Sequence, residues 1–227
     1  MNLTRLKDSC GHQLICGSSI LTVMLYHIHV YESRVNVGIV NGKQAKPHSR
    51  PYMVSIQNSF KHTCGGFLIS DEFVMTAAHC WKGYPNILTV VVGAHDLRKS
   101  EISDRMIKSL NNGCVFELQL QEKVKLNNNV KWISLPKEGD ANMTTINHTV
   151  CQHKWGSKYL ASQMICAHGH GGSCKGDSGG PLVCGNTAVG VTSFGSSECC
   201  NSPKLPNVYT KISAYLPWIH QIIRNIK

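Results

Sequence analysis

Hydrophobic residues fall in short runs along most of this chain, and polar or turn-forming residues separate the runs. Each run is either continuously apolar or alternates between apolar and polar side chains. Runs of this kind predict the β-strands of a sandwich or barrel. The clearest of them span residues 52–56, 66–69, 73–76, 88–92 and 188–194.

The last residues of the chain follow a helical period. Apolar side chains recur there every three or four positions, with polar residues between them, and this spacing predicts an amphipathic helix. These apolar positions are Leu216, Ile219, Ile222, Ile223 and Ile226. We therefore expect a mostly β chain with one closing helix. Its 227 residues suffice for one large all-β domain, with breaks expected near residues 111–113 and 137–149.

The first 38 residues differ from the rest. Arg5 and Lys7 precede a stretch, residues 9–31, that contains no Lys, Arg, Asp or Glu, and an apolar run occupies residues 20–25. The order is similar to that of a secretory signal, although the small residues come before the apolar run. The segment is too polar for a stable membrane span. We assign residues 1–38 to a signal- or propeptide-like segment and residues 39–227 to the folded domain.

Cysteine content and charge narrow the class of protein. Eleven cysteines indicate an oxidising compartment and a disulfide framework, and their odd number leaves at least one outside an internal pair. Lys and Arg total 23 against 13 Asp and Glu, a net charge of +10. The basic residues are dispersed, which is typical of a solvated surface, while the excess charge keeps an anionic polysaccharide open as a partner. We expect a monomer with no nucleic-acid partner.

Residues 171–185, with the sequence GGSCKGDSGGPLVCG, have the composition of a nucleophile site. Asp177 and Ser178 stand there among glycines. Small residues let a substrate carbonyl approach the backbone, whose N–H groups then stabilise the charge that develops on the carbonyl oxygen. A serine nucleophile also needs a base, and the motif TAAHC at residues 76–80 offers His79.

Four motifs in this order resemble those of the chymotrypsin-like, trypsin-fold serine endopeptidases. They are GIVNG at residues 38–42, TAAHC at 76–80, GDSGGP at 176–181 and PNVYTKISAYLPWI at 206–219. Residues 46–57 and 62–69 look most like the branch of granzymes, mast-cell proteases and duodenase. The resemblance implies two antiparallel six-stranded β-barrels with a C-terminal helix. It also implies a secreted or granule-stored zymogen that acts on protein or peptide substrates without a cofactor or metal.

The resemblance assigns roles residue by residue. Ser178 would be the nucleophile, His79 the general base and acid, and the N–H groups of Gly176 and Ser178 the oxyanion hole. Cleavage before Ile39 would free an ammonium group that pairs with Asp177 and orders the site.

Three further positions match the primary specificity pocket of the family. Gly172 corresponds to the floor of the pocket, where an enzyme that cleaves after Lys or Arg has an acidic residue. Gly195 and Asn207 match the walls. The resemblance therefore implies an uncharged pocket that would admit an apolar or aromatic side chain, with an unspecified polar preference added by Asn207.

The same matching implies a set of disulfides, each worth about 2 to 4 kcal/mol. They pair Cys64 with Cys80, Cys151 with Cys166, and Cys174 with Cys199 or Cys200. A zinc site made of Cys166, His168, His170 and Cys174 is an alternative interpretation, but its spacing is not a common zinc pattern.

The chain departs from the family at the third catalytic residue. Counting back from Gln121 puts Cys114 where the family has an aspartate, and the segment before it is short. Glu117 on the same strand would face the opposite side. A cysteine in a buried strand is typically a small apolar core residue.

A second gap follows residues 132–136, where the family continues through a cysteine and another strand. Cys184 thereby loses its expected partner, and residues 39–227 are fewer than such a domain usually has. We expect an incomplete fold that lacks strand-sized segments, either in the protein itself or through an incorrect assembly of its coding segments. The predicted function is a serine endopeptidase with a non-trypsin-like pocket, impaired by the missing aspartate. The alternative is an inactive homologue that binds glycans or other ligands through its positive charge.

Overall fold

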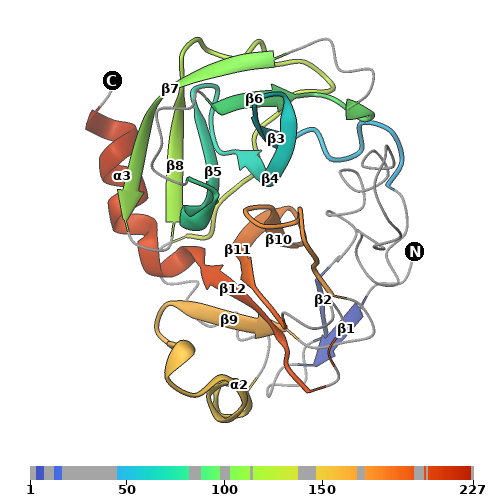
Figure 1. Cartoon of the computed structure of the whole chain (residues 1–227), viewed down its shortest axis with the longest axis vertical. Coiled ribbons are helices and arrows are strands. Elements are labelled where there is room, and N and C mark those ends of the chain that lie inside the picture. The colour runs from blue at the N-terminus through green and yellow to red at the C-terminus, as the bar shows by residue number, and fades with distance from the viewer. Residues whose placement is uncertain are drawn as a thin grey trace.

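The computed structural model describes most of the chain from residue 45 onward and two short strands before it. The described residues are 4–7, 13–16, 45–81, 88–97, 103–112, 115–137, 147–167, 172–196, 202 and 204–225. Two antiparallel sheets form the molecule, one above the other in Figure 1, and the C-terminal helix runs along one side.

The first sheet is a closed six-stranded barrel with the strand order β3-β4-β5-β8-β7-β6. Its strands are β3 (Met53–Asn58), β4 (Lys61–Leu68), β5 (Phe73–Ala77), β6 (Leu88–Val92), β7 (Ser103–Asn112) and β8 (Val115–Leu120). The barrel is complete although the sequence is short before Cys114, so that shortening removes no strand from it.

The second sheet has the order β1-β2-β10-β11-β12-β9 and is not closed. Its strands are β1 (Thr4–Lys7), β2 (Gln13–Cys16), β9 (Met164–Ala167), β10 (Pro181–Cys184), β11 (Thr187–Phe194) and β12 (Asn207–Lys211). Two of its six strands, β1 and β2, thus come from residues 1–38, which we assigned to a signal- or propeptide-like segment. Cys16 of β2 lies opposite Cys184 of β10.

Helical segments connect and close the two sheets. They are the 3-10 turns η2 (Ala78–Cys80), η4 (Gly156–Lys158) and η5 (Ile212–Tyr215), and the helices α2 (His148–Trp155) and α3 (Leu216–Asn225). The predicted C-terminal helix is confirmed as α3, and the five predicted runs all lie in or overlap strands β3, β4, β5, β6 and β11. Helix α2 was not predicted. None of the helices in the described ranges is long and apolar enough to cross a bilayer.

One hydrophobic core joins the two sheets. Buried residues of the barrel, such as Phe67 and Leu118, belong to the same cluster as Val191 of β11 and as Leu216 and Ile219 of α3. Helix α3 therefore closes the core that both sheets share, with its polar residues on the outside.

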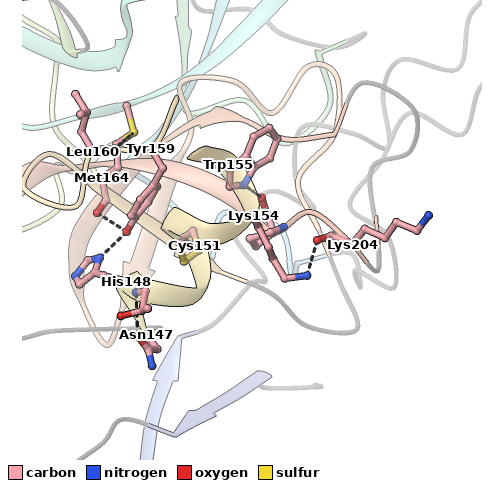
Figure 2. The surroundings of a disulfide bond; sticks show 12 residues. Asn147, His148, Cys151, Lys154, Trp155, Tyr159, Leu160, Met164 and Lys204 are labelled. Atoms are coloured by element: carbon pink, nitrogen blue, oxygen red, sulfur yellow. Dashed lines mark hydrogen bonds between the residues drawn. A yellow bond between two sulfur atoms is a disulfide. The ribbon is translucent and has the colours of Figure 1, made fainter. Parts of the chain in front are cut away.

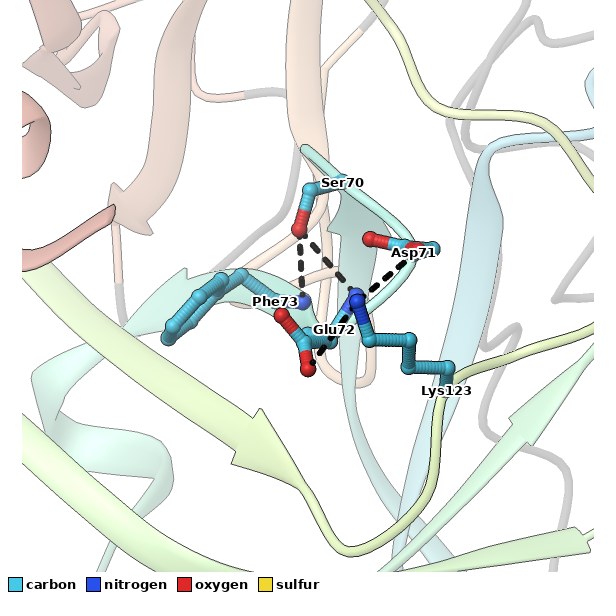
Figure 3. Close-up of polar contacts among 5 residues, drawn as sticks. All are labelled: Ser70, Asp71, Glu72, Phe73 and Lys123. Atoms are coloured by element: carbon cyan, nitrogen blue, oxygen red, sulfur yellow. Dashed lines mark hydrogen bonds and ion pairs between the residues drawn. The ribbon is translucent and has the colours of Figure 1, made fainter. Parts of the chain in front are cut away.

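A tight turn sets the start of β5, the strand that leads to His79. The Ser70 hydroxyl accepts hydrogen bonds from the backbone N–H groups of Glu72, at 3.1 Å, and Phe73, at 3.0 Å (Figure 3). The Lys123 ammonium lies 3.7 Å from Asp71 and 3.4 Å from Glu72. Such exposed ion pairs contribute little, so the serine turn is the main local constraint.

Candidate active site

The loop that carries Ser178 is bonded to both sheets. The carbonyl oxygen of Ser178 accepts a 2.8 Å hydrogen bond from the N–H of Gly65 on β4, and the N–H of Gly179 donates at 2.8 Å to Thr192 on β11. Gly180 donates back to Asp177 at 3.0 Å. These bonds hold the serine where the barrel and the second sheet meet.

Gly179 cannot carry a side chain in this arrangement. Its φ is +83°, and a Cβ there would lie 2.0 Å from Thr76 Oγ1 and 2.4 Å from the carbonyl oxygen of Gly65. Both atoms belong to the first barrel. A glycine after Ser178 therefore lets the serine loop approach the barrel directly.

His79 lies close to the serine loop, at the end of β5. It is an exposed residue of η2, and a ring nitrogen lies within 4.8 Å of the sulfur atoms of Cys64 and Cys80. These cysteines form the predicted disulfide. Cys80 Sγ in turn lies 3.8 Å from the carbonyl oxygen of Ser178. The disulfide thus anchors the turn that bears His79 beside the turn that bears Ser178.

The backbone N–H groups around Ser178 differ in their partners. The N–H of Asp177 donates to the carbonyl of Cys174 at 3.1 Å. Within the described part of the chain, no acceptor receives a hydrogen bond from the N–H of Gly176 or of Ser178. Gly176 has a φ of +96°, a conformation that glycine adopts readily. Two amides on either side of Asp177 are therefore available to an external acceptor.

His62 fixes the peptide at Gly176, a contact that the sequence analysis missed. Its Nε2 lies 3.0 Å from the carbonyl oxygen of Gly176, and its Nδ1 lies 2.8 Å from Ser55 Oγ. A carbonyl only accepts, so Nε2 carries the proton and the Ser55 hydroxyl donates to Nδ1. Burial lowers the pKa of His62, although its bond to Gly176 opposes the shift. The signal that sequence offered was the position of His62, two residues before Cys64.

Asp177 is a buried carboxyl group with one bonded oxygen. Only 1% of the residue is exposed. Its Oδ2 accepts a 2.7 Å hydrogen bond from the N–H of Cys174, and no partner within the described residues reaches Oδ1. Burial raises the pKa of Asp177 to about 7, against the lowering effect of the Cys174 N–H. The Oδ1 atom of Asp177 can therefore accept a hydrogen bond or pair with a cation.

The three predicted pocket residues lie near the serine loop. Gly172 and Asn207 are buried, and Gly195 is half-buried. A Cβ built on Gly195 would lie 2.4 Å from Asn207 Oδ1, so the Asn207 amide contacts Gly195 directly. Burial raises the pKa of Tyr209, which lies two residues after Asn207 on β12.

Helix α2 packs against the two segments that carry Gly195 and Asn207. Trp155 donates from its indole N–H to the carbonyl of Pro206 at 2.9 Å and packs edge-on against Phe194, with ring centroids 5.1 Å apart. The predicted disulfide between Cys151 and Cys166 is confirmed and ties α2 to β9 (Figure 2). Trp155 therefore contacts the residue before each wall position, Gly195 and Asn207.

A further set of polar contacts orients α2. The side-chain oxygen of Asn147 caps the helix by accepting from the N–H of Thr149 at 2.9 Å. His148 Nδ1 lies 2.5 Å from the hydroxyl of Tyr159, which donates to the carbonyl of Met164 at 3.1 Å (Figure 2). Burial raises the pKa of Tyr159 to about 12, so the phenol stays protonated and keeps this bond.

Several sequence predictions fall on residues outside the described ranges. These are the amino-terminal partner Ile39, the counted triad position Cys114, and Cys199 and Cys200. Cys174 and Cys184 are each in a disulfide. The disulfide between Cys151 and Cys166, together with the one at Cys174, rules out the alternative zinc site, which needed the thiolates of Cys166 and Cys174.

Comparison with known proteins agrees with this arrangement. The family model described as Trypsin matches residues 39–161 and 139–219. Rat serine protease 57 is 32% identical over 234 residues, covering 82% of this chain and 83% of that protein. Human cathepsin G is 32% identical over 235 residues, covering 83% of this chain and 89% of that protein.

The comparisons also bear on the missing segments and on the fold. The alignment with serine protease 57 has more positions than this chain has residues, so the relative contains residues here that the chain lacks. The structure of mouse neuropsin, a serine protease, superposes with a TM-score of 0.69 at 27% identity, covering 81% of this chain and 99% of neuropsin. The chain belongs to the trypsin family of chymotrypsin-like serine proteases.

Proposed function

We propose that this chain is a serine endopeptidase that forms an acyl-enzyme on Ser178. The observation that carries the proposal is the pair of amides at Gly176 and Ser178, which have no acceptor within the described residues although Asp177 between them is bonded. Preorganised N–H groups beside a serine stabilise the negative charge of a tetrahedral intermediate.

His79 and Ser178 then perform the steps of acyl transfer. His79 accepts the proton of the Ser178 hydroxyl as the oxygen attacks the substrate carbonyl, and returns it to the leaving amine. A water molecule next attacks the ester with His79 as base, which releases the acid product and restores Ser178. His62 is a positioning residue in this scheme, since it holds the Gly176 peptide.

Turnover is slow because the triad position holds Cys114. Val115, the next residue, pairs with Ala77, two positions before His79, which agrees with the count that selected residue 114. A neutral thiol does not stabilise an imidazolium as a carboxylate does. Loss of the aspartate lowers kcat by about 10⁴-fold, or about 5 to 6 kcal/mol in the barrier.

Activation follows cleavage before Ile39. The new ammonium group would pair with Asp177, whose Oδ1 has no partner within the described residues and whose pKa burial raises to about 7. An ammonium next to this carboxyl favours its ionised form. This pairing makes the chain a zymogen.

The disulfides and the sequence motifs support a cellular location for this protein and a branch of the family. The disulfides at Cys64 and Cys151 require an oxidising compartment, so we infer a protein that is secreted or stored in a secretory granule. The sequence at residues 46–57 and 62–69 supports a place in the granzyme, mast-cell protease and duodenase branch.

The test is labelling by a fluorophosphonate, which reacts only with an activated serine. Residues 34–38 of the full chain are replaced by Asp-Asp-Asp-Asp-Lys, so that enteropeptidase cuts before Ile39. We expect slow labelling that disappears in Ser178→Ala and accelerates at least 100-fold in Cys114→Asp. A folded, cleaved protein that is not labelled in either form would overturn the proposal. Salt-sensitive binding of that protein to heparin would then favour the glycan-binding alternative.

A further inference from the structure

We propose that the Asn207 amide closes the primary pocket to large side chains, so that the enzyme cleaves after small, uncharged residues such as Ala, Ser and Val. This inference rests on the proposed function, since it names the substrate class of the same site. It narrows the expectation from sequence, which allowed an apolar or aromatic side chain.

The closure follows from the distance between the two walls. Asn207 Oδ1 lies 2.4 Å from the position that a Cβ on Gly195 would occupy. Non-bonded carbon atoms need about 3.5 to 4.0 Å. No methylene or ring carbon of a substrate therefore fits between Gly195 and Oδ1. A glycine at 195 leaves this space open in principle, and the amide of Asn207 fills it.

The amide is fixed where it lies. Only 7% of Asn207 is exposed, and the residue lies on the same face of β12 as the buried Tyr209. A rotation that moved the amide away from Gly195 would carry it through a packed, buried environment, where an unpaired polar group costs about 1 to 3 kcal/mol.

The walls are fixed as well, so a large side chain cannot separate them. Trp155 donates to the carbonyl of Pro206, directly before Asn207, and packs against Phe194, directly before Gly195. Strand pairing between Phe194 and Val208 joins the same two segments. The Tyr209 phenol, on the same face of β12 as Asn207, is neutral at physiological pH, because burial raises its pKa.

The test compares enteropeptidase-cleaved full chain with Asn207→Gly and Asn207→Ala. The exposed Asn128→Gly is the matched control. Succinyl-Ala-Ala-Pro-X p-nitroanilides with X as Ala, Val, Phe or Lys report specificity, in the Cys114→Asp background where turnover is faster. Binding of 5-fluoroindole, followed by ¹⁹F NMR, reports the pocket without any catalysis. Asn207→Ala keeps the test valid if Asn207→Gly fails to fold.

We expect wild type to prefer Ala and Val, and Asn207→Gly to raise the Phe-to-Ala ratio of kcat/KM by about 100-fold. Saturable fluoroindole binding should appear in the Asn207 variants and be absent from wild type and Asn128→Gly. Equal cleavage after Phe and Ala by wild type, or fluoroindole binding by wild type, would overturn the inference and leave the protease activity intact. If no variant cleaves any substrate, the proposed function fails, and the fluoroindole titration still decides whether Asn207 closes the pocket.

Discussion

Replacing Asp177 by Asn should stabilise the uncleaved chain at neutral and higher pH. In the uncleaved chain the folded-state pKa of Asp177 is about 7, against 3.8 for an unperturbed aspartate. Between these values the folded chain keeps a proton that the unfolded chain has released, so stability falls as pH rises. About 3 pKa units at 1.36 kcal/mol each correspond to about 4 kcal/mol, reached above pH 7. Asparagine has no such charge, and its side-chain oxygen can still accept from the N–H of Cys174.

The assay is urea unfolding, monitored by tryptophan fluorescence from pH 4 to pH 8, in the Ser178→Ala background to prevent self-cleavage. His62 titrates in part of this range with the opposite sign, because its lowered pKa removes stability as pH falls below about 6.5. That contribution is common to both proteins and cancels in their difference. The advantage of Asp177→Asn should grow from near zero at pH 4 to about 4 kcal/mol at pH 8.

Cleavage before Ile39 should reverse the sign of this difference. The carboxylate then gains an ammonium partner, and removing one member of a buried ion pair costs about 3 to 5 kcal/mol. Asp177→Asn should therefore be the less stable protein once both are cleaved. If Asp177→Asn is no more stable than wild type at pH 8 before cleavage, the carboxylate already has a partner in the uncleaved chain, and the argument for activation is refuted.

Three other changes test the surroundings of the site. His62→Phe removes the bond to Gly176 and should lower kcat about 10-fold with KM nearly unchanged, whereas an equal change in KM would contradict a positioning role. Gly179→Ala should cost more than 3 kcal/mol in urea unfolding because of its 2.0 Å contact, while Gly185→Ala, also at positive φ but with open space around its Cβ, should cost about 1 kcal/mol. Equal costs would show that the contact is relieved elsewhere. Trp155→Phe keeps an aromatic ring but loses the indole donor, so it should lower stability by about 1 kcal/mol and weaken discrimination against Phe substrates; unaltered specificity would show that Trp155 does not brace the pocket walls.

Sequence predicted the parts of the molecule whose pattern is local. The helical period of its apolar residues located α3, since burial of one face dictates where Leu216 must stand, and a continuous apolar run located β5, whose residues are all buried. The disulfides at Cys64 and Cys151 followed from motif matching. Helix α2 escaped prediction because its eight residues are mostly polar and only Cys151 is fully buried, so no apolar stripe marks it.

The contacts that define the site lie beyond local patterns. Asn207 and Gly195 were both assigned to the pocket, yet only the pairing of β11 with β12 reveals that the Asn207 side chain reaches the other wall. His62 and Gly176 are separated by 114 positions in sequence. The first contact is set by strand pairing within the second sheet and the other by how the serine loop packs on the barrel, and no run of hydrophobic residues encodes either.

The position of α3 within the shared core has a consequence for biosynthesis. Leu216 and Ile219 follow the strands of both sheets in the chain, so the ribosome adds them after those strands, yet they lie in the same cluster as Phe67 of the barrel. Burial of each contributes about 1.5 to 3 kcal/mol. The nascent barrel must therefore remain unfinished, with apolar surface exposed, until residues 216–219 have emerged from the ribosome. A premature stop codon shortly before residue 216 would keep His79 and Ser178, the proposed catalytic residues, and still yield a chain dependent on chaperones.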